Sequence, residues 1–396
     1  MRRIHQADAL RGLSLVGILL ANLLIFQYGL TGQDYLEYMN IGPLSNALAI
    51  AMKVLIVHSF IPIFGILFGF SMDKLFQSMK RKNIKAKRFK LLLRAIALMV
   101  LGAIHAQFIW HGDILLTYGM TMLILIVFIN FKTGFFKWCI WIIGAISIFI
   151  IIASLFYSEP TEEIGTEKIK NYLSQTSNIY QNGSYYDIHF TIDSIEDPTL
   201  EKWGVSNEEK GLLFLAVPLS ILPLFIIGVY LSRTDWFLSV TEGFWRNRLW
   251  LYLIPVSIVI KFLHLLLPTG FFESASTFFD VVLAVGYMVV FKWLYERFQG
   301  HSVMQGLESM GKMSLTMYIA QSIFGTLVFY SYGLGLFNTN ILWLSVPVFV
   351  AFYCLQVYIA KQYMKHWRYG PLEYILRVVT YLKIKPQKVK MTQDKV

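Results

Sequence analysis

Charge and cysteine are both scarce in this 396-residue sequence. Charged residues make up 15% of the chain, against about 25% in soluble domains, which excludes an ordinary globular protein in water. The two cysteines, Cys139 and Cys354, lie in apolar runs, so a disulfide scaffold and a zinc cluster are excluded. The Walker A loop, the G-x-G-x-x-G pattern, the G-x-S-x-G elbow and the H-E-x-x-H motif are all absent. We therefore expect no metal site and no permanently bound cofactor.

Apolar residues dominate what is present. Hydrophobic residues make up 56% of the chain, and they fall in blocks of about twenty, the length that a helix needs to cross ~30 Å of hydrocarbon. We expect an all-α, polytopic integral membrane protein that forms a single transmembrane domain over residues 1–396. The ten predicted spans lie near residues 9–30, 45–72, 91–110, 113–130, 137–157, 210–231, 249–267, 276–296, 311–333 and 341–362.

The distribution of lysine and arginine predicts the orientation. Basic residues cluster at the N-terminus, after the second span, in 232–248 and in the tail 363–396, and ten spans place all of these on one side. The positive-inside rule makes this side the cytoplasm, with both termini. Residues 158–209 contain eleven Asp and Glu against three Lys, so we expect an extracytoplasmic cap between helices 1–5 (residues 1–157) and helices 6–10 (residues 210–362). The tail is expected to carry an interfacial helix.

The net charge of +11 needs no nucleic-acid partner. Cytoplasmic basic loops bind anionic lipid headgroups at about 1 kcal/mol per charge, and this explains most of the excess. Membrane lipids are therefore the expected partners of these loops, and a homodimer is left open.

Polar groups at membrane depth are costly and mark candidate sites. Asp8 and Arg11 stand three residues apart at the inner end of the first span, where they can pair on one helix face. An ordinary helix start explains the same pattern, because Asp favours the helix N-terminus and Arg marks the cytoplasmic side.

The turn between the third and fourth spans carries the most informative cluster. It contains His105, Trp110, His111 and Asp113, and Tyr118 follows. His105 lies about 9 Å below His111 along a helix, so it is partly shielded from water. An imidazole oriented there by Asp113 or Tyr118 has the chemistry of a general base. An interfacial belt with a capping Asp is the alternative, which we prefer for His111 but not for His105.

The second span contains a further histidine. His58 is predicted at mid-membrane, where Pro62 removes a backbone hydrogen bond and the side chain must face the protein interior. It is a second candidate for a catalytic imidazole or a proton relay. We favour the third option, a hydrogen bond between helices.

Two clusters follow near the C-terminus. Ser314, Tyr318 and Gln321 form one polar stripe on the ninth span. After the tenth span, Gly-Pro starts a short interfacial helix in which Glu373 faces Arg377 at the favourable four-residue spacing. Arg377 and Arg368 can hold a nucleotide phosphate, although lipid binding is the commoner use of such arginines.

These segments, in this order, resemble the YeiB-like family of bacterial inner-membrane proteins of unknown function. The matching motifs are DALRG (8–12), FGILFGF (64–70), GAIHA and WHGDIL (102–115), GKMSLTMY (311–318) and WRYGPLEY (367–374). The resemblance implies a multi-pass protein of the bacterial plasma membrane. The DALRG opening also resembles the heparan-glucosaminide acetyltransferases, which take acyl-CoA from the cytoplasm and acylate a substrate on the far side.

The resemblance implies roles for particular residues. Asp8 and Arg11 would belong to the CoA side of the core, and His105 would be the acyl-transfer histidine, placed by depth. The glucosaminide enzymes carry their histidine between the first two core spans, where this chain has residues 33–38 without one.

The preferred hypothesis is therefore a membrane acyltransferase. Acyl-CoA, such as acetyl-CoA, would be the co-substrate, held near Arg11, Arg368 or Arg377. His105, supported by Asp113, would activate a hydroxyl or amine of a small-molecule, glycan or lipid acceptor, with other aromatic and polar residues binding the substrates. The substrate-binding candidates are Trp110, Tyr118, Ser314, Tyr318 and Gln321. A transporter or flippase for an amphipathic solute is the alternative, and a non-catalytic scaffold or sensor is the third.

Overall fold

The computed structural model describes residues 4–156, 165–199, 210–238, 249–384 and 387. These ranges contain helices and no strand, which confirms the all-α class. The α-helices are α1 (His5–Tyr28), α2 (Pro43–Leu55), α3 (Phe60–Arg81), α4 (Lys87–Phe108), α5 (Leu115–Phe128), α6 (Thr133–Ala153), α7 (Thr166–Asn182), α8 (Lys210–Arg233), α9 (Leu249–Leu266), α10 (Gly270–Arg297), α11 (Ser302–Lys312), α12 (Ser314–Phe329), α13 (Leu342–His366) and α14 (Pro371–Tyr381).

Within the described residues, eight helices are long and apolar enough to cross a membrane, with α2 and α3 taken together. They coincide with eight of the ten predicted spans. The other two predicted spans, 113–130 and 311–333, coincide with the shorter apolar helices α5 and α12, which have 14 and 16 residues. A multi-pass membrane protein is thus established, whereas the count of ten and the orientation stay predictions.

The second predicted span is broken. The break lies at residues 56–59, and Pro62 falls in the first turn of α3, where its missing N–H costs no helical hydrogen bond. His58 adopts a left-handed backbone with φ of 61° and is exposed, so the expected inward orientation is wrong.

A buried lysine explains why His58 need not face inward. Lys261 Nζ, on α9, donates hydrogen bonds to Val57 O and Ser59 Oγ, both at 2.8 Å, and lies 2.5 Å from Asp280 Oδ1. The Tyr287 hydroxyl donates to the backbone at the end of α2 at 3.0 Å. Side chains of α9 and α10 thus satisfy the backbone that the break leaves open, as irregular structure at membrane depth requires.

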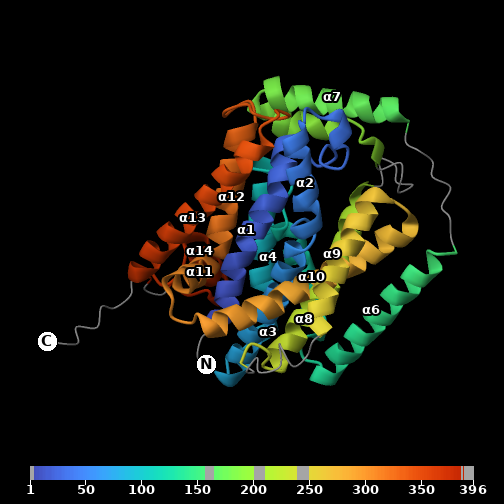
Figure 1. Cartoon of the computed structure of the whole chain (residues 1–396). Helices are drawn as coiled ribbons and strands as arrows, with labels where there is room; N and C mark the ends of the chain where they lie inside the picture. Colours follow the sequence, from blue (N-terminus) through green and yellow to red (C-terminus); the bar gives the residue numbers. More distant parts are fainter. Residues whose placement is uncertain (1–3, 157–164, 200–209, 239–248, 385–386, 388–396) are drawn as a thin grey trace.

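The α1 helix runs through the centre of the bundle, and α7 lies across one end of it (Figure 1). Two glycines allow α1 and α11 to approach closely. A Cβ on Gly12 would collide with the Leu307 carbonyl, and one on Gly311 would collide with the Asp8 carbonyl. This contact brings the DALRG and GKMSLTMY motifs together, although they are separated by about three hundred residues.

The described part of the predicted cap consists of α7 and two short helical turns, Asp187–Thr191 and Ile192–Ser194. Gln181 donates to the Phe337 carbonyl at 2.9 Å, and Gln107 on α4 donates to the His189 carbonyl at 2.9 Å. These hydrogen bonds fasten the segment to the bundle at the end of α4 where His105 lies.

Candidate functional site

A buried histidine and aspartate meet where α4 ends. His105 Nδ1 lies 2.8 Å from Asp113 Oδ1, and the two side chains are 1% and 2% exposed. After Phe108, the backbone amides of Ile109 and Trp110 both bond to the His105 carbonyl, at 2.9 and 2.8 Å. This tight turn carries the chain back toward α5 and brings together the histidine and the carboxylate that the sequence analysis selected.

Asp113 serves two partners. Its Oδ2 accepts a hydrogen bond from Leu116 N at 2.7 Å and so caps α5, while Oδ1 holds His105. The sequence left open whether Asp113 caps a helix or orients His105, and in the structure this one side chain does both. A Cβ on Gly102 would lie 2.7 Å from Asp113 Oδ2, so the glycine makes room for the carboxylate.

The pairing determines which imidazole nitrogen can act as a base. A carboxylate beside Nδ1 favours the tautomer with its proton on Nδ1, which leaves Nε2 of His105 with a free lone pair. Nε2 is buried and has no hydrogen-bond partner within the described part of the chain. The arrangement is that of a general base held ready by an aspartate.

Aromatic rings surround this imidazole. The Tyr318 ring on α12 lies 5.4 Å from the His105 ring, centroid to centroid, and Trp110 lies 6.4 Å away, edge-on. Trp110 in turn packs against Phe26 of α1 at 4.4 Å. The His105–Asp113 pair, which we call the dyad, therefore lies in a site walled by α1, α4 and α12. The aromatic rings exclude water from this site.

The predicted stripe on α12 divides among three environments. Ser314 lines a cavity, Tyr318 lies between that cavity and His105, and Gln321 is buried and donates to Gln356 of α13 at 2.9 Å. Tyr118 donates to a backbone carbonyl of α3 at 3.4 Å and packs among phenylalanines, so Asp113, and not Tyr118, orients His105.

A cavity of about 480 Å³ opens toward the other end of α4, and we call it the inner cavity. Arg94 of α4 lines it, eleven residues before His105, which is roughly 16 Å along the helix. Tyr318 also lines it and so joins the cavity to the dyad. Further residues of its lining are Asp8, Arg11, Lys74, Lys312, Ser314, Glu373 and Arg377.

Two arginines of the inner cavity are held by specific contacts. Arg11 donates to Asp8 Oδ1 at 3.2 Å, the pairing that the sequence suggested, and also to Ser71 of α3. The Arg377 guanidinium lies over the rings of Tyr369 and Tyr381, 4.8 and 4.9 Å from their centroids. Planar cations fixed in this way are suited to bind phosphate.

Glu373 has a different partner from the one expected. Its carboxylate accepts hydrogen bonds from the backbone amides of Leu315 and Thr316, at 2.7 and 3.0 Å, and from the Thr316 hydroxyl at 2.7 Å. It thus caps α12 from α14, because the first amides of a helix need an acceptor, and the predicted pairing with Arg377 is replaced. Burial raises the pKa of Glu373, and the hydrogen bonds from Thr316 oppose this shift.

Two predicted residues lie outside the site. Arg368 is exposed, does not line the inner cavity, and its backbone amide bonds to Gln387. His58 lies at the α2–α3 break, near the carboxylates of Asp34 and Asp280. Arg94 is the residue that sequence analysis missed, although a lone arginine within the apolar run Leu91–Ile96 was a usable signal.

Two family models match the chain, one in each half. Residues 3–179 match the model described as "Heparan-alpha-glucosaminide N-acetyltransferase, catalytic", and residues 231–383 match "Protein of unknown function (DUF418)". The chain is 27% identical to the uncharacterized protein YxaH of Bacillus subtilis (strain 168), over 97% of this chain and 96% of that protein. It is 24% identical to the uncharacterized protein YeiB of Escherichia coli (strain K12), over 96% and 97%. The chain is therefore similar to YeiB-like proteins over nearly its whole length.

The site draws on both matched regions of the chain. His105, Asp113 and Arg94 come from the acetyltransferase-like region, and Tyr318 and Arg377 come from the region of unknown function. The match relates the first half of the chain to membrane acetyltransferases at the level of the family. No solved structure matches the chain significantly.

Proposed function

We propose that this protein is a membrane acyltransferase that moves an acyl group from acyl-CoA to a hydroxyl or amine of an acceptor. The observation that supports this most directly is that one residue, Tyr318, lines the inner cavity and also contacts the His105 ring. A donor bound in the cavity therefore extends toward a general base at the far end of α4.

The inner cavity has the chemistry that acyl-CoA requires. Arg11, Arg94 and Arg377 bind the phosphates, and Tyr369 and Tyr381 offer flat rings at the same end. The apolar stretch past Phe64 and Phe68 accommodates the pantetheine arm, and the thioester arrives beside Tyr318.

The dyad supplies the proton transfers. His105 Nε2 removes a proton from the acceptor hydroxyl or amine, whose oxygen or nitrogen attacks the thioester carbonyl. The carbon–sulfur bond then breaks, the CoA thiolate leaves, and the imidazolium returns the proton to that sulfur. Asp113 holds the ring and stabilises its charged form, so the protein needs only general acid–base catalysis and a positioned donor.

The transporter alternative receives less support. Its expected path runs from His58 along the α12 stripe, yet His58 is exposed at the α2–α3 break and Gln321 is engaged with Gln356 of α13. Side chains that bond to neighbouring helices stabilise the bundle and do not line a route.

Calorimetric binding of CoA and acetyl-CoA to the protein in detergent tests the proposal. Arg94→Gln weakens binding about tenfold or more, because a charge-assisted contact to phosphate is worth about 1.5–3 kcal/mol. Arg368→Gln is the matched control, an arginine outside the cavity, and leaves binding unchanged. His105→Ala binds CoA normally but transfers the acyl group far more slowly. Absence of saturable binding by any acyl-CoA would overturn the proposal.

A further inference from the structure

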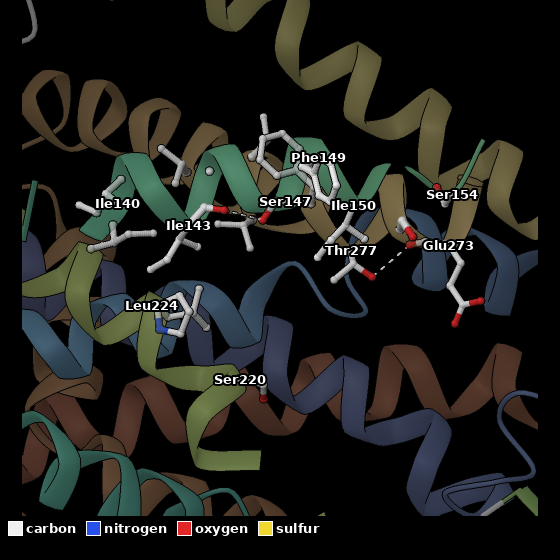
Figure 2. Close-up of a pocket in the computed structure, with 18 of the residues that line it drawn as sticks. Ile140, Ile143, Ser147, Phe149, Ile150, Ser154, Ser220, Leu224, Glu273 and Thr277 are labelled. Atoms are coloured by element: carbon white, nitrogen blue, oxygen red, sulfur yellow. Dashed lines mark hydrogen bonds between the residues drawn. The ribbon is translucent and has the colours of Figure 1, made fainter. Parts of the chain in front are cut away.

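A second and larger cavity lies on the opposite flank of the bundle. Its volume is about 940 Å³, and its walls come from α6 on one side and from α8, α9 and α10 on the other. It shares no lining residue with the inner cavity. Figure 2 shows the α6 wall, with Ile140, Ile143, Ser147 and Ile150 directed into the space between the helices. All four helices are long and apolar enough to cross a membrane, so the cavity lies at hydrocarbon depth.

Four of the five hydroxyl-bearing residues that line this cavity bond to carbonyls of their own segments. Ser147 and Ser154 donate to carbonyls of the α6 segment at 3.0 and 2.8 Å. Ser220 and Thr277 likewise donate to carbonyls of their own helices, at 2.8 and 3.1 Å. A hydroxyl bonded to its own backbone offers little to a polar ligand. The walls are therefore apolar in effect, and they fit a hydrocarbon chain.

One end of the cavity is polar. Glu273 is the one charged side chain among the described residues of the lining, and it is exposed. Figure 2 shows Glu273 and Ser154 together at one end, whereas Ile140 and Ile143 lie toward the other. Glu273 stands in the first turn of α10 and Ser154 just follows α6, so this end lies at a membrane surface. The predicted orientation makes that surface the outer one.

We propose that this cavity binds an outer-leaflet phospholipid, with its acyl chains between α6 and α8–α10 and an amine-bearing headgroup, of the phosphatidylethanolamine type, at Glu273. The apolar walls select for hydrocarbon, and the carboxylate at the rim complements a cationic amine. The cavity volume falls in the range of about 300–1,000 Å³ that is typical of ligand sites. The inference is independent of the proposed acyl transfer.

The α6 helix offers a matched pair of substitutions. A Cβ on Gly144, which lines the cavity, or on Gly134, which does not, would meet no atom within 4 Å. Gly144→Phe therefore adds a ring to the cavity wall from a position where the Cβ is free of contacts, and Gly134→Phe adds the same ring to the same helix elsewhere. Glu273→Gln removes the charge at the rim and leaves the walls intact.

Native mass spectrometry of the detergent-purified protein, delipidated and then titrated with phosphatidylethanolamine or phosphatidylglycerol, provides the test. We expect the wild type and Gly134→Phe to retain phosphatidylethanolamine in preference, Gly144→Phe to lose the bound lipid, and Glu273→Gln to retain lipid without the headgroup preference. Equal lipid retention by Gly144→Phe and Gly134→Phe would overturn the proposal. The proposal would also be overturned if the wild type were a dimer that Gly144→Phe dissociates. In that case a second copy of the chain would occupy the cavity.

Discussion

Two buried acid–base pairs, His105–Asp113 and Lys261–Asp280, each join neighbouring helices, and they differ in what they leave unused. Their closest N···O distances are 2.8 and 2.5 Å, and the basic side chains are 1% and 4% exposed. The Lys261 ammonium group donates hydrogen bonds to Val57 O and Ser59 Oγ and forms an ion pair with Asp280. His105 keeps Nε2 without a partner among the described residues.

This difference distinguishes a structural ion pair, Lys261–Asp280, from a reactive pair, His105–Asp113. Both pairs carry charge at membrane depth, so the presence of an ionisable residue there does not by itself identify catalysis. What distinguishes His105 is an unused lone pair next to a cavity residue, Tyr318. Lys261 instead stabilises the break between α2 and α3.

The largest effect is expected at His105. His105→Ala should lower the rate of acyl transfer about 10²–10⁴-fold, because general acid–base catalysis contributes that much, while CoA binding is retained. Turnover with a competent acceptor is the measurement. His58→Gln, which alters an imidazole outside the site, should retain activity. Equal losses in both variants would refute the assignment of the base to His105.

Removal of Lys261 should affect stability more than chemistry. Lys261→Met leaves Asp280 buried and uncompensated, which lowers the free energy of unfolding by about 3–5 kcal/mol. The double variant Lys261→Met/Asp280→Leu should recover most of that loss, because it removes both charges. Thermal unfolding in detergent measures both. A double variant as unstable as the single one would argue against a stabilising role of the Lys261–Asp280 ion pair.

A second buried imidazole, His189, extends the comparison to the cap. Its neighbour is another imidazole, His111, with ring centroids 5.4 Å apart, and Tyr185 and Tyr332 pack on it at 4.4 and 6.1 Å. Burial, and then His111, lower the pKa of His189 to about 4.

The folded pKa of His189 is thus below its unfolded value, so the unfolded chain binds more protons between these two values. Stability from this group is complete above about pH 6.5 and is lost as the pH falls toward 4. Unfolding midpoints measured from pH 7 to 4 should decline less in His189→Phe than in the wild type. An identical decline in both would contradict this prediction.

The smallest effect is expected at the Gln321–Gln356 contact. Replacement of both residues by leucine should change the free energy of unfolding by about 0.6–1.7 kcal/mol, the range of hydrogen bonds between membrane helices. Acyl transfer should be unchanged, as measured by the same turnover assay. If the double variant were stable but lost acyl transfer, Gln321 would instead be a substrate-binding residue.

The sequence by itself determined the all-α membrane class, because hydropathy blocks act locally and need no partner. It also selected His105 and Asp113, which are eight residues apart across one tight turn. Helix packing over long sequence distances decided the rest. Tyr318 reaches His105 from α12, Glu373 caps α12 from α14, and Lys261 supports a break some two hundred residues earlier. Such contacts depend on which helices lie side by side, and the spacing of residues along one helix does not contain that information.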